Sequence, residues 1–322
     1  MFGRHWLIVG CVAFGAAGAH ASYEMLITAS TSGTFYRYDL ENRISLGTFS
    51  NFQCKNVTSM TSIASANRTY ASDSFGRIHR FNHFTGEYLG SFASGKSGIK
   101  QLSPMANGNI LVTDATTIGV FNPTTGTLVT NVVLVAGDTP VGAVQLPDLS
   151  FASFSYIAGR TYYRNLHTAS GLLNISSQFQ VGVSAANEYV GVGLDGSDLI
   201  VWGKTQSAYA AGSFKRVSST VALTSSNITS SALGSDEAFI SSNSARTHSG
   251  RWVNVQDFQS ISSSARAVYF IEPQTNTVEL VGGFGWSGGK VAGVSTILAP
   301  EPGTWLAMGA GLVLIARRRK AR

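Results

Sequence analysis

The sequence predicts an all-β fold and, within that class, a β-propeller. Three observations support this prediction: the composition, the alternation of apolar and polar residues, and a repeat of about 40 residues. Charged residues make up only 12% of the 322 residues, hydrophobic residues make up 44%, and there are 35 glycines. A chain that is poor in charge and rich in Gly, Ser, Thr and aromatic residues is typical of many short strands joined by turns.

The formal net charge of +6 belongs mostly to the chain ends. Residues 300–322 hold five basic residues and one acidic residue, whereas residues 22–299 are close to neutral. Nucleic-acid binding requires a basic surface that displaces counterions from phosphates. The body has no such cluster in its sequence, so nucleic acid is not an expected partner.

Residues 1–21 have the three parts of a secretory signal peptide. Residues 4–5 form a short basic start, residues 6–18 are apolar, and Ala19 and Ala21 are the small residues of a cleavage site. Cleavage there would begin the mature chain at the next residue. A lipoprotein signal is the alternative, but the apolar run before its cysteine is too short. The sequence therefore predicts export.

Loss of the signal peptide would also remove Cys11. Cys54 would then be the remaining cysteine, so no disulfide within the chain is expected. We expect Cys54 to act as a small buried apolar residue rather than as a reactive thiol.

A pattern recurs in the body, residues 22–299. The copies Asp73–Leu89 and Asp114–Leu128 share the consensus Asp, a few residues, Ile-x-x-Phe-Asn-x-x-Thr-Gly-x-Leu. Looser copies lie at 34–46, 162–173, 195–203 and 268–278. The Asn or Asp is expected to cap the turn through its side chain, and the Gly supplies the positive φ that hairpin turns need. Each copy therefore predicts two strands joined by a tight turn.

The period of the pattern predicts the number of blades. The marker positions are 38 to 43 residues apart and lie at 39, 82, 122, 165 and 203. This is the length of one four-stranded propeller blade. Division of residues 22–299 by the period gives just under seven units, so seven blades are predicted, with six as the alternative. The first strand, near Met25–Ala29, and the last, near Val291–Leu298, are expected to lie in the same or adjacent blades, because a propeller must leave no open edge.

The chain ends on three elements in a fixed order. Pro300, Glu301 and Pro302 come first, and the prolines cannot continue a strand or a helix. A predicted transmembrane segment follows at residues 303–316, and a basic tail at 317–322. The side chains that would hold this tail on the cytoplasmic side of the membrane are Arg317, Arg318, Arg319 and Lys320.

The apolar run Trp305–Ala316 is short for a permanent anchor. As a helix it would span about 18 Å, whereas the hydrocarbon core of a bilayer is about 30 Å thick. The sequence therefore predicts a temporary anchor that is processed after export.

This tail, residues 300–322, resembles the PEP-CTERM sorting signal of Gram-negative bacteria. The resemblance implies that Pro300, Glu301 and Pro302 are recognised as substrate residues by an exosortase, a membrane-embedded processing enzyme. It also implies a cell-surface or extracellular protein of a species that makes exopolysaccharide and biofilm. The body more weakly resembles NHL-like and YncE-like propellers.

Motifs that would indicate catalysis are mostly absent from the sequence. Residues 285–289 match G-x-S-x-G by letters, but a nucleophile elbow needs a later histidine and the last one is His248. His79 and His83 are expected to be exposed polar strand residues rather than metal ligands, and Asp195–Asp198 is expected to be a plain turn rather than a calcium loop. No catalytic residue, metal site or cofactor is predicted.

Three tryptophans, Trp202, Trp252 and Trp286, could form a platform for stacking sugars, although packing within the blades is the favoured interpretation. The sequence thus favours a non-enzymatic interaction module with exopolysaccharide as a candidate partner. The alternative is a secreted propeller lyase or glycosidase with its site at the central channel. Carboxylates or histidines at the channel mouth would favour the enzyme, and Ser, Thr and aromatic residues would favour binding.

Overall fold

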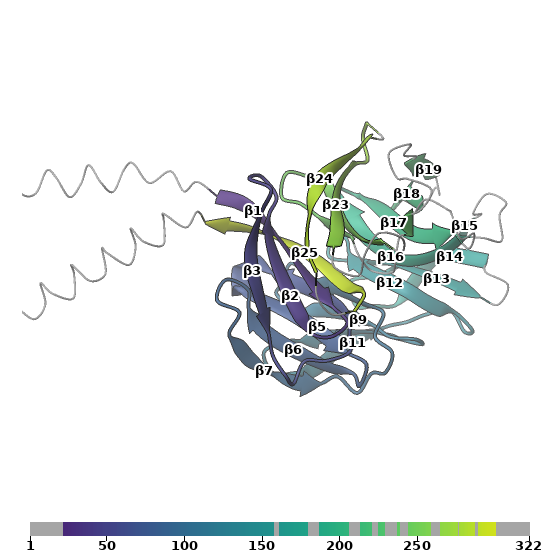
Figure 1. The fold of residues 1–322 in the computed structure, drawn as a ribbon. Helices are drawn as coiled ribbons and strands as arrows, with labels where there is room; N and C mark the ends of the chain where they lie inside the picture. Colours follow the sequence, from purple (N-terminus) through teal and green to yellow (C-terminus); the bar gives the residue numbers. More distant parts are fainter. Residues whose placement is uncertain are drawn as a thin grey trace, which may run out of the picture.

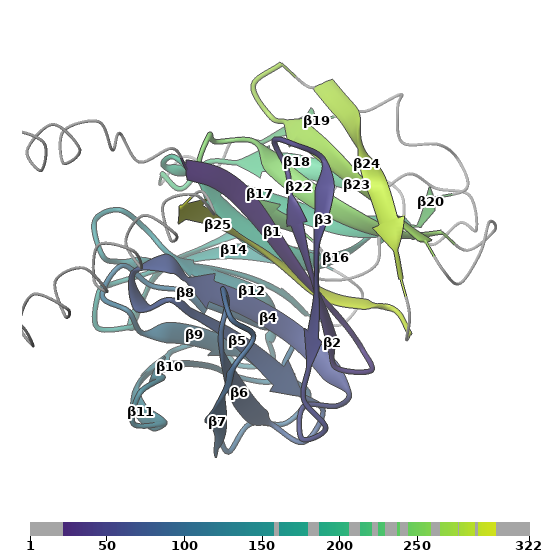
Figure 2. The ribbon, with the colours of Figure 1, turned by 60° about the vertical axis from the view of Figure 1, so that its left-hand side comes forward.

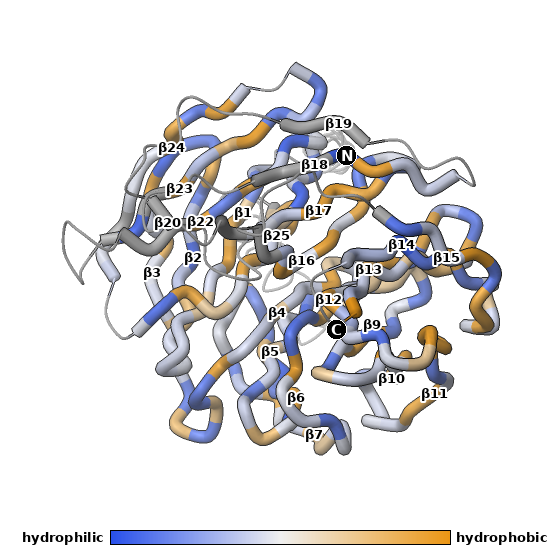
Figure 3. Tube along the Cα trace, turned by 90° about the vertical axis from the view of Figure 1, so that its right-hand side faces the viewer, coloured by the Kyte–Doolittle hydropathy of each residue, from blue (hydrophilic) through white to orange (hydrophobic). Residues whose placement is uncertain are grey.

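The fold is a ring of six β-sheets around a central axis (Figures 1 and 3). The computed structural model describes residues 22–157, 161–179, 187–205, 213–220, 225–228, 237–238, 244–258, 265–275, 277–286 and 289–300. Within these residues the secondary structure is all β apart from one short 3-10 turn, η1 (Ala64–Ala66). The predicted fold class is confirmed.

Each sheet is one blade with antiparallel neighbours, numbered here from the N-terminus. Blade 1 contains β25 (Val291–Pro300), β1 (Ser22–Ser30), β2 (Thr34–Asp39) and β3 (Ile44–Ser50). Blade 2 contains β4 (Val57–Ile63), β5 (Arg68–Asp73), β6 (Arg77–Asn82) and β7 (Tyr88–Ala93). Blade 3 contains β8 (Gln101–Pro104), β9 (Ile110–Thr113), β10 (Ile118–Asn122) and β11 (Thr127–Val132).

Blades 4 to 6 form the second half of the ring. Blade 4 contains β12 (Thr139–Gln145), β13 (Phe151–Ile157), β14 (Thr161–His167) and β15 (Leu173–Phe179). Blade 5 contains β16 (Asn187–Asp195), β17 (Asp198–Thr205), β18 (Ser213–Val217) and β19 (Ser225–Ile228). Blade 6 contains β20 (Glu237–Ala238) and β21 (Ser244–Arg246), which both pair with β22 (Trp252–Phe258), then β23 (Ala265–Glu272) and β24 (Thr277–Gly285).

The prediction of seven blades is wrong, and the alternative of six is correct for the described residues. The six copies of the sequence pattern fall one to a blade. The error came from dividing the body by a constant period, because the step from β17 to β23 is longer than the earlier steps. Within that step, residues 244–246 form β21 and residue 252 begins β22, and both strands belong to blade 6.

The ring is closed by pairing the last strand with the first. β25 lies beside β1 over its whole length, from Ser22 opposite Pro300 to Ser30 opposite Val291 (Figure 2). The Oγ1 of Thr28 also donates a hydrogen bond to the carbonyl of Gly293 at 3.0 Å. The predicted closure is confirmed. It joins the two ends of the body in one blade and leaves β1 with a partner on both sides.

The innermost strands form the wall of the axis, in the order β25, β4, β8, β12, β16 and β21. We call the face at their C-terminal ends the lower face; it carries Ile63, Pro104, Gln145, Asp195, Arg246 and Pro300. The opposite, upper face is at their N-terminal ends. β1 begins and β25 ends on the same side of the molecule (Figure 1), at the lower face.

Six hydrophobic clusters hold the blades together, one between each pair of neighbours. Between blades 1 and 2, for example, Phe35 lies 4.7 Å from Phe81 and stacks on Phe49 at 4.8 Å, measured between ring centroids. Burial of one such side chain stabilises a protein by roughly 1.5–3 kcal/mol. Since both sheet faces of a blade pack against neighbours, the inner strands are buried on both sides, whereas outermost strands such as β3 and β11 are largely exposed.

The predicted turn chemistry is confirmed in blades 2 and 3. The Oδ1 of Asn82 accepts hydrogen bonds from the amides of Phe84 and Thr85, at 2.9 and 3.1 Å. The Oδ1 of Asn122 accepts the equivalent bonds from the amides of Thr124 and Thr125. Gly86 and Gly126 have φ of 76° and 75°. These turns also touch the previous blade, since a Cβ on Gly86 would lie 2.6 Å from that of Phe49.

Candidate functional site

The candidate site is a cavity of about 290 Å³ on the central axis, toward the lower face. All six blades contribute to its lining through their innermost strands. Pro104 and Arg246 are exposed at its mouth, whereas Ser59, Gln101 and Ser103 are buried deeper inside. The cavity is therefore a pocket that opens at the lower face.

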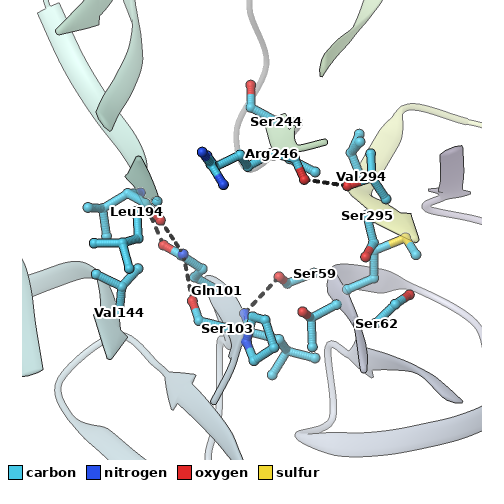
Figure 4. Close-up of a pocket in the computed structure, with 18 of the residues that line it drawn as sticks. Ser59, Ser62, Gln101, Ser103, Val144, Leu194, Ser244, Arg246, Val294 and Ser295 are labelled. Carbon is cyan, nitrogen blue, oxygen red and sulfur yellow. Dashed lines mark hydrogen bonds between the residues drawn. The ribbon is translucent and has the colours of Figure 1, made fainter. Parts of the chain in front are cut away.

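Gln101 forms the inner end of this pocket. Its Nε2 donates hydrogen bonds to the carbonyl of Val192 at 2.6 Å and to the Oγ of Ser103 at 2.8 Å. Its Oε1 accepts a hydrogen bond from the amide of Val192 at 3.2 Å. Figure 4 shows the side chain reaching away from β8 toward β16. The side-chain amide of Gln101 thus pairs with the backbone of Val192 through one donated and one accepted hydrogen bond, and it joins blade 3 to blade 5.

Hydroxyl groups make up most of the polar wall (Figure 4). The cavity is lined by Ser59, Thr61, Ser62, Ser103, Ser244, Ser295 and Thr296. Some of them also hold the wall together: the Oγ of Ser59 accepts a hydrogen bond from the amide of Leu102 at 3.0 Å, and that of Ser244 accepts one from Asn254 at 2.9 Å. Because a hydroxyl has one donor and two acceptor positions, these groups keep capacity for a ligand.

Arg246 supplies the positive charge at the mouth. It is the one charged residue among the lining residues that the structure describes, and 40% of its side chain is exposed. Its Nε donates to the Oδ1 of Asp195 at 3.0 Å, while Arg216 holds the other oxygen of Asp195 at 2.9 Å. The carboxylate fixes the orientation of the Arg246 guanidinium, whose remaining N–H groups are donors for a ligand.

The three tryptophans do not form one platform. Trp202 and Trp252 line the cavity and pack together, with ring centroids 5.5 Å apart, and both are buried. Trp286 belongs to a different cluster, where it stacks on Tyr36 at 4.3 Å. The interpretation as blade packing is therefore correct for all three, with two of them also facing the site.

The four histidines within the described residues lie away from the cavity. The expectation that His79 and His83 are exposed is wrong, since both are fully buried. The Nε2 of His79 lies 3.0 Å from the Oδ2 of Asp73, and its Nδ1 lies 3.3 Å from the hydroxyl of Tyr88. These contacts tie β6 to its neighbours on either side. Both faces of a propeller blade are covered by neighbouring blades, so a polar position in the alternating pattern need not be exposed. The sequence alone therefore could not show that these histidines are buried.

Burial keeps two histidines neutral. Burial lowers the pKa of His83 to about 4, against the smaller opposing effect of the Arg68 backbone, which accepts a hydrogen bond from the ring. Burial likewise lowers the pKa of His167 to about 4, and its Nε2 lies 2.8 Å from the Oγ of Ser153. Among the described residues no cluster of three or more His, Cys, Asp or Glu side chains is arranged to hold a metal.

The other motifs have structural roles in the described chain. Asp195 and Asp198 face each other across the β16–β17 turn and are paired with Arg216. Gly285 ends β24, and Trp286 donates its Nε1 hydrogen bond to the carbonyl of Gly289 at 2.7 Å. Cys54 is buried as expected.

The predicted sorting residues lie mostly outside the described residues. Pro300 is the last residue of β25, with its backbone opposite Ser22. The predicted positions outside the description are Ala19, Ala21, Glu301, Pro302, Arg317, Arg318, Arg319 and Lys320, together with the whole predicted span 303–316. Within the part of the chain that is described, no helix has the length and apolar character needed to cross a membrane.

Apart from Trp202 and Trp252, the residues that line the cavity were not predicted from the sequence. Gln101 and Arg246 lie at the ends of the short strands β8 and β21, and the serines are inconspicuous in a serine-rich chain. Gln101 begins β8, whose sequence is Gln-Leu-Ser-Pro, and nothing in this short strand marks it as a site residue. Its partner Val192 is two blades away, so the pair could not be read from the sequence.

Comparison with known proteins agrees with this description. A profile of the PEP-CTERM protein-sorting motif matches residues 298–320, so the chain carries this motif. The match begins within β25 and includes every residue of the predicted motif and basic cluster. No curated protein matches the chain by sequence.

Solved structures are similar in fold. A protein of unknown function from Bacteroides caccae matches with a TM-score of 0.58 at 12% identity, over 86% of this chain and 99% of that one. The β-propeller domain of Myceliophteria thermophila Cps50 (Swd1) matches with 0.51 at 12%, over 83% and 84%. Kuenenia stuttgartiensis hydrazine synthase matches with 0.52 at 10%, over 76% and 75%. At these identities the similarity extends to the β-propeller fold alone.

Proposed function

We propose that this chain is a cell-surface or extracellular interaction module, without catalytic activity, that binds a small polar ligand in its central cavity. The PEP-CTERM motif implies sorting by an exosortase and a membrane-anchored precursor that is exported. The predicted signal peptide at residues 1–21 would start this route. We also propose that the ligand is part of an exopolysaccharide and that the protein acts in biofilm.

The observation that carries the binding role is the lining of the cavity. It offers hydroxyls, two amides, two indole rings and one guanidinium, and the lining residues that the structure describes include no carboxylate and no imidazole. General acid–base catalysis needs a positioned group that can exchange a proton near neutral pH. Hydroxyl donors and acceptors beside aromatic rings instead suit a ligand with many hydroxyl groups, such as a saccharide unit.

The test is binding of saccharides by calorimetry to the purified protein. Arg246→Ala should weaken binding at least tenfold, because it removes the donors at the mouth. Arg43→Ala is the control, since Arg43 is also ion-paired, to Glu279 at 2.6 Å, but stands outside the lining. Equal affinity of the two variants would contradict the site, and release of shortened or unsaturated products would instead favour the lyase or glycosidase alternative.

A further inference from the structure

We propose that the anchored precursor holds the mouth of the cavity against the membrane, so that large partners reach it only after the tail is released. This inference rests on the proposed function, because it concerns access to the cavity as a binding site. It follows from the position of one strand. β25 both lines the cavity and leads directly into the sorting motif.

The anchor leaves the propeller beside the axis and on the same face as the mouth. Ser295 and Thr296 line the cavity, and β25 continues from there to Pro300 at the lower face. A strand advances about 3.3 Å per residue, so the last cavity residue and the end of β25 are about 13 Å apart. An anchor attached at the outer rim of a blade would allow the ring to tilt its mouth away. An anchor on the innermost strand keeps the mouth near the bilayer whatever the tilt.

The connection to the membrane is short. Four residues, 301–304, separate Pro300 from Trp305, the first residue of the apolar run. In any conformation these residues span at most roughly 18 Å. Thr296, on the side of the cavity formed by β25, therefore stays within about 30 Å of the bilayer surface. A folded domain of 100 residues, with a radius of gyration of about 13 Å, does not fit freely into such a gap, whereas a small molecule does.

Two alanines of blade 3 provide matched probes of this geometry. Ala106 is exposed in the β8–β9 turn at the lower face, next to the lining residue Pro104. Ala115 is exposed in the β9–β10 turn at the upper face. Cys54 is buried, and its burial raises the pKa of the thiol to about 12, so it contributes no background labelling. Ala106→Cys and Ala115→Cys each place one reactive thiol on one face.

The experiment compares residues 22–322, which lack Cys11 and are reconstituted in phosphatidylcholine vesicles, with a chain of residues 22–300. Each variant is labelled with a small membrane-impermeant maleimide and with a maleimide carrying a 5-kDa polyethylene glycol. For Ala106→Cys, the ratio of large-probe to small-probe rates should be at least fivefold lower in the precursor. For Ala115→Cys it should be the same in both forms.

Insertion of twenty Gly/Ser residues between Pro302 and Gly303 should restore labelling by the large probe, because such a linker has a root-mean-square length of about 25 Å. Equal ratios for Ala106→Cys in the precursor and in the truncated chain would overturn the proposal. Labelling requires no ligand, so this result is separate from success or failure of the saccharide-binding test.

Discussion

Gln101 reaches Val192 because residue 142, on the strand between them, is glycine. A Cβ on Gly142 would lie 1.8 Å from the Oε1 of Gln101 and 2.9 Å from the Cγ1 of Val192. The missing side chain leaves a passage over β12, and the glutamine amide fills it. The inner end of the cavity thus depends on residues from three consecutive blades.

Gly142→Ala should destabilise the protein by about 2–4 kcal/mol, since it forces Gln101 away and leaves buried polar groups unpaired. The measurement is the free energy of unfolding from urea titration. Gly285→Ala, where an added Cβ would meet nothing within 4 Å, is the control and should change little. If Gly142→Ala and Gly285→Ala have the same effect, the bridge between Gln101 and Val192 is not important for stability.

Gly126→Ala should cost more stability than Gly108→Ala. Both glycines have positive φ, 75° and 82°, so both substitutions carry a backbone penalty of roughly 1–2 kcal/mol. At Gly126 the new methyl would also lie 2.8 Å from the Cβ of Phe92 in the previous blade, whereas at Gly108 it meets nothing within 4 Å. An additional loss of about 1–3 kcal/mol is expected at Gly126. Urea titration of both variants measures this difference, and equal losses would show that the turn does not pack against blade 2 in solution.

The protein should lose stability as the pH falls from about 6.5 to about 4. Burial lowers the pKa of His83 and His167 to about 4, below the unfolded value of 6.5. The unfolded chain therefore binds protons first in this window, and folding stability decreases by up to roughly 3 kcal/mol for each histidine. Above pH 6.5 this contribution is fully present.

Melting temperatures measured between pH 4 and 7.5 test this linkage. His167→Gln should flatten the profile, whereas the exposed His248→Gln should keep the wild-type slope. An unchanged profile for His167→Gln would show that this histidine is not held neutral.

Cys54 should be inert in the native protein. Burial, with a smaller contribution from the charge of Asp73, raises the pKa of its thiol to about 12, so little thiolate forms at neutral pH. An aromatic disulfide reagent should react with the thiol only after denaturation, and Cys54→Ser should cost about 1 kcal/mol. A disulfide-linked dimer on non-reducing gels, lost in the variant, would show that the thiol is accessible.

Truncation should separate the sorting tail from the fold. A chain that ends at Pro300 keeps all of β25 and should unfold in one cooperative transition. A chain that ends at Lys290 loses β25 and leaves the inner edge of β1 unpaired, so it should aggregate. Thermal unfolding and gel filtration of the two chains, produced without residues 1–21, measure this. Aggregation of the chain that ends at Pro300 would mean that the tail contributes to folding.

The sequence by itself determined the features that depend on neighbouring residues. The Asn82 cap and the positive φ of Gly86 follow from local turn chemistry, so the hairpins and the all-β class were predictable. Closure by β1 and β25 was predictable too, because a ring of sheets must pair its ends. The sorting motif could be recognised because its three elements are contiguous in the chain.

Only the tertiary structure decided the number of blades and the composition of the site. The number of blades depends on how many residues each blade contains. The repeat is longer between β17 and β23 than elsewhere, so the period is not constant. The cavity is assembled from strand ends in six blades, and the contact between Gln101 and Val192 depends on an absent side chain at Gly142. His79, in β6, and His83, in the turn that follows it, are buried because other parts of the ring cover them. Such relationships between distant residues arise from packing and leave no periodic pattern in the sequence.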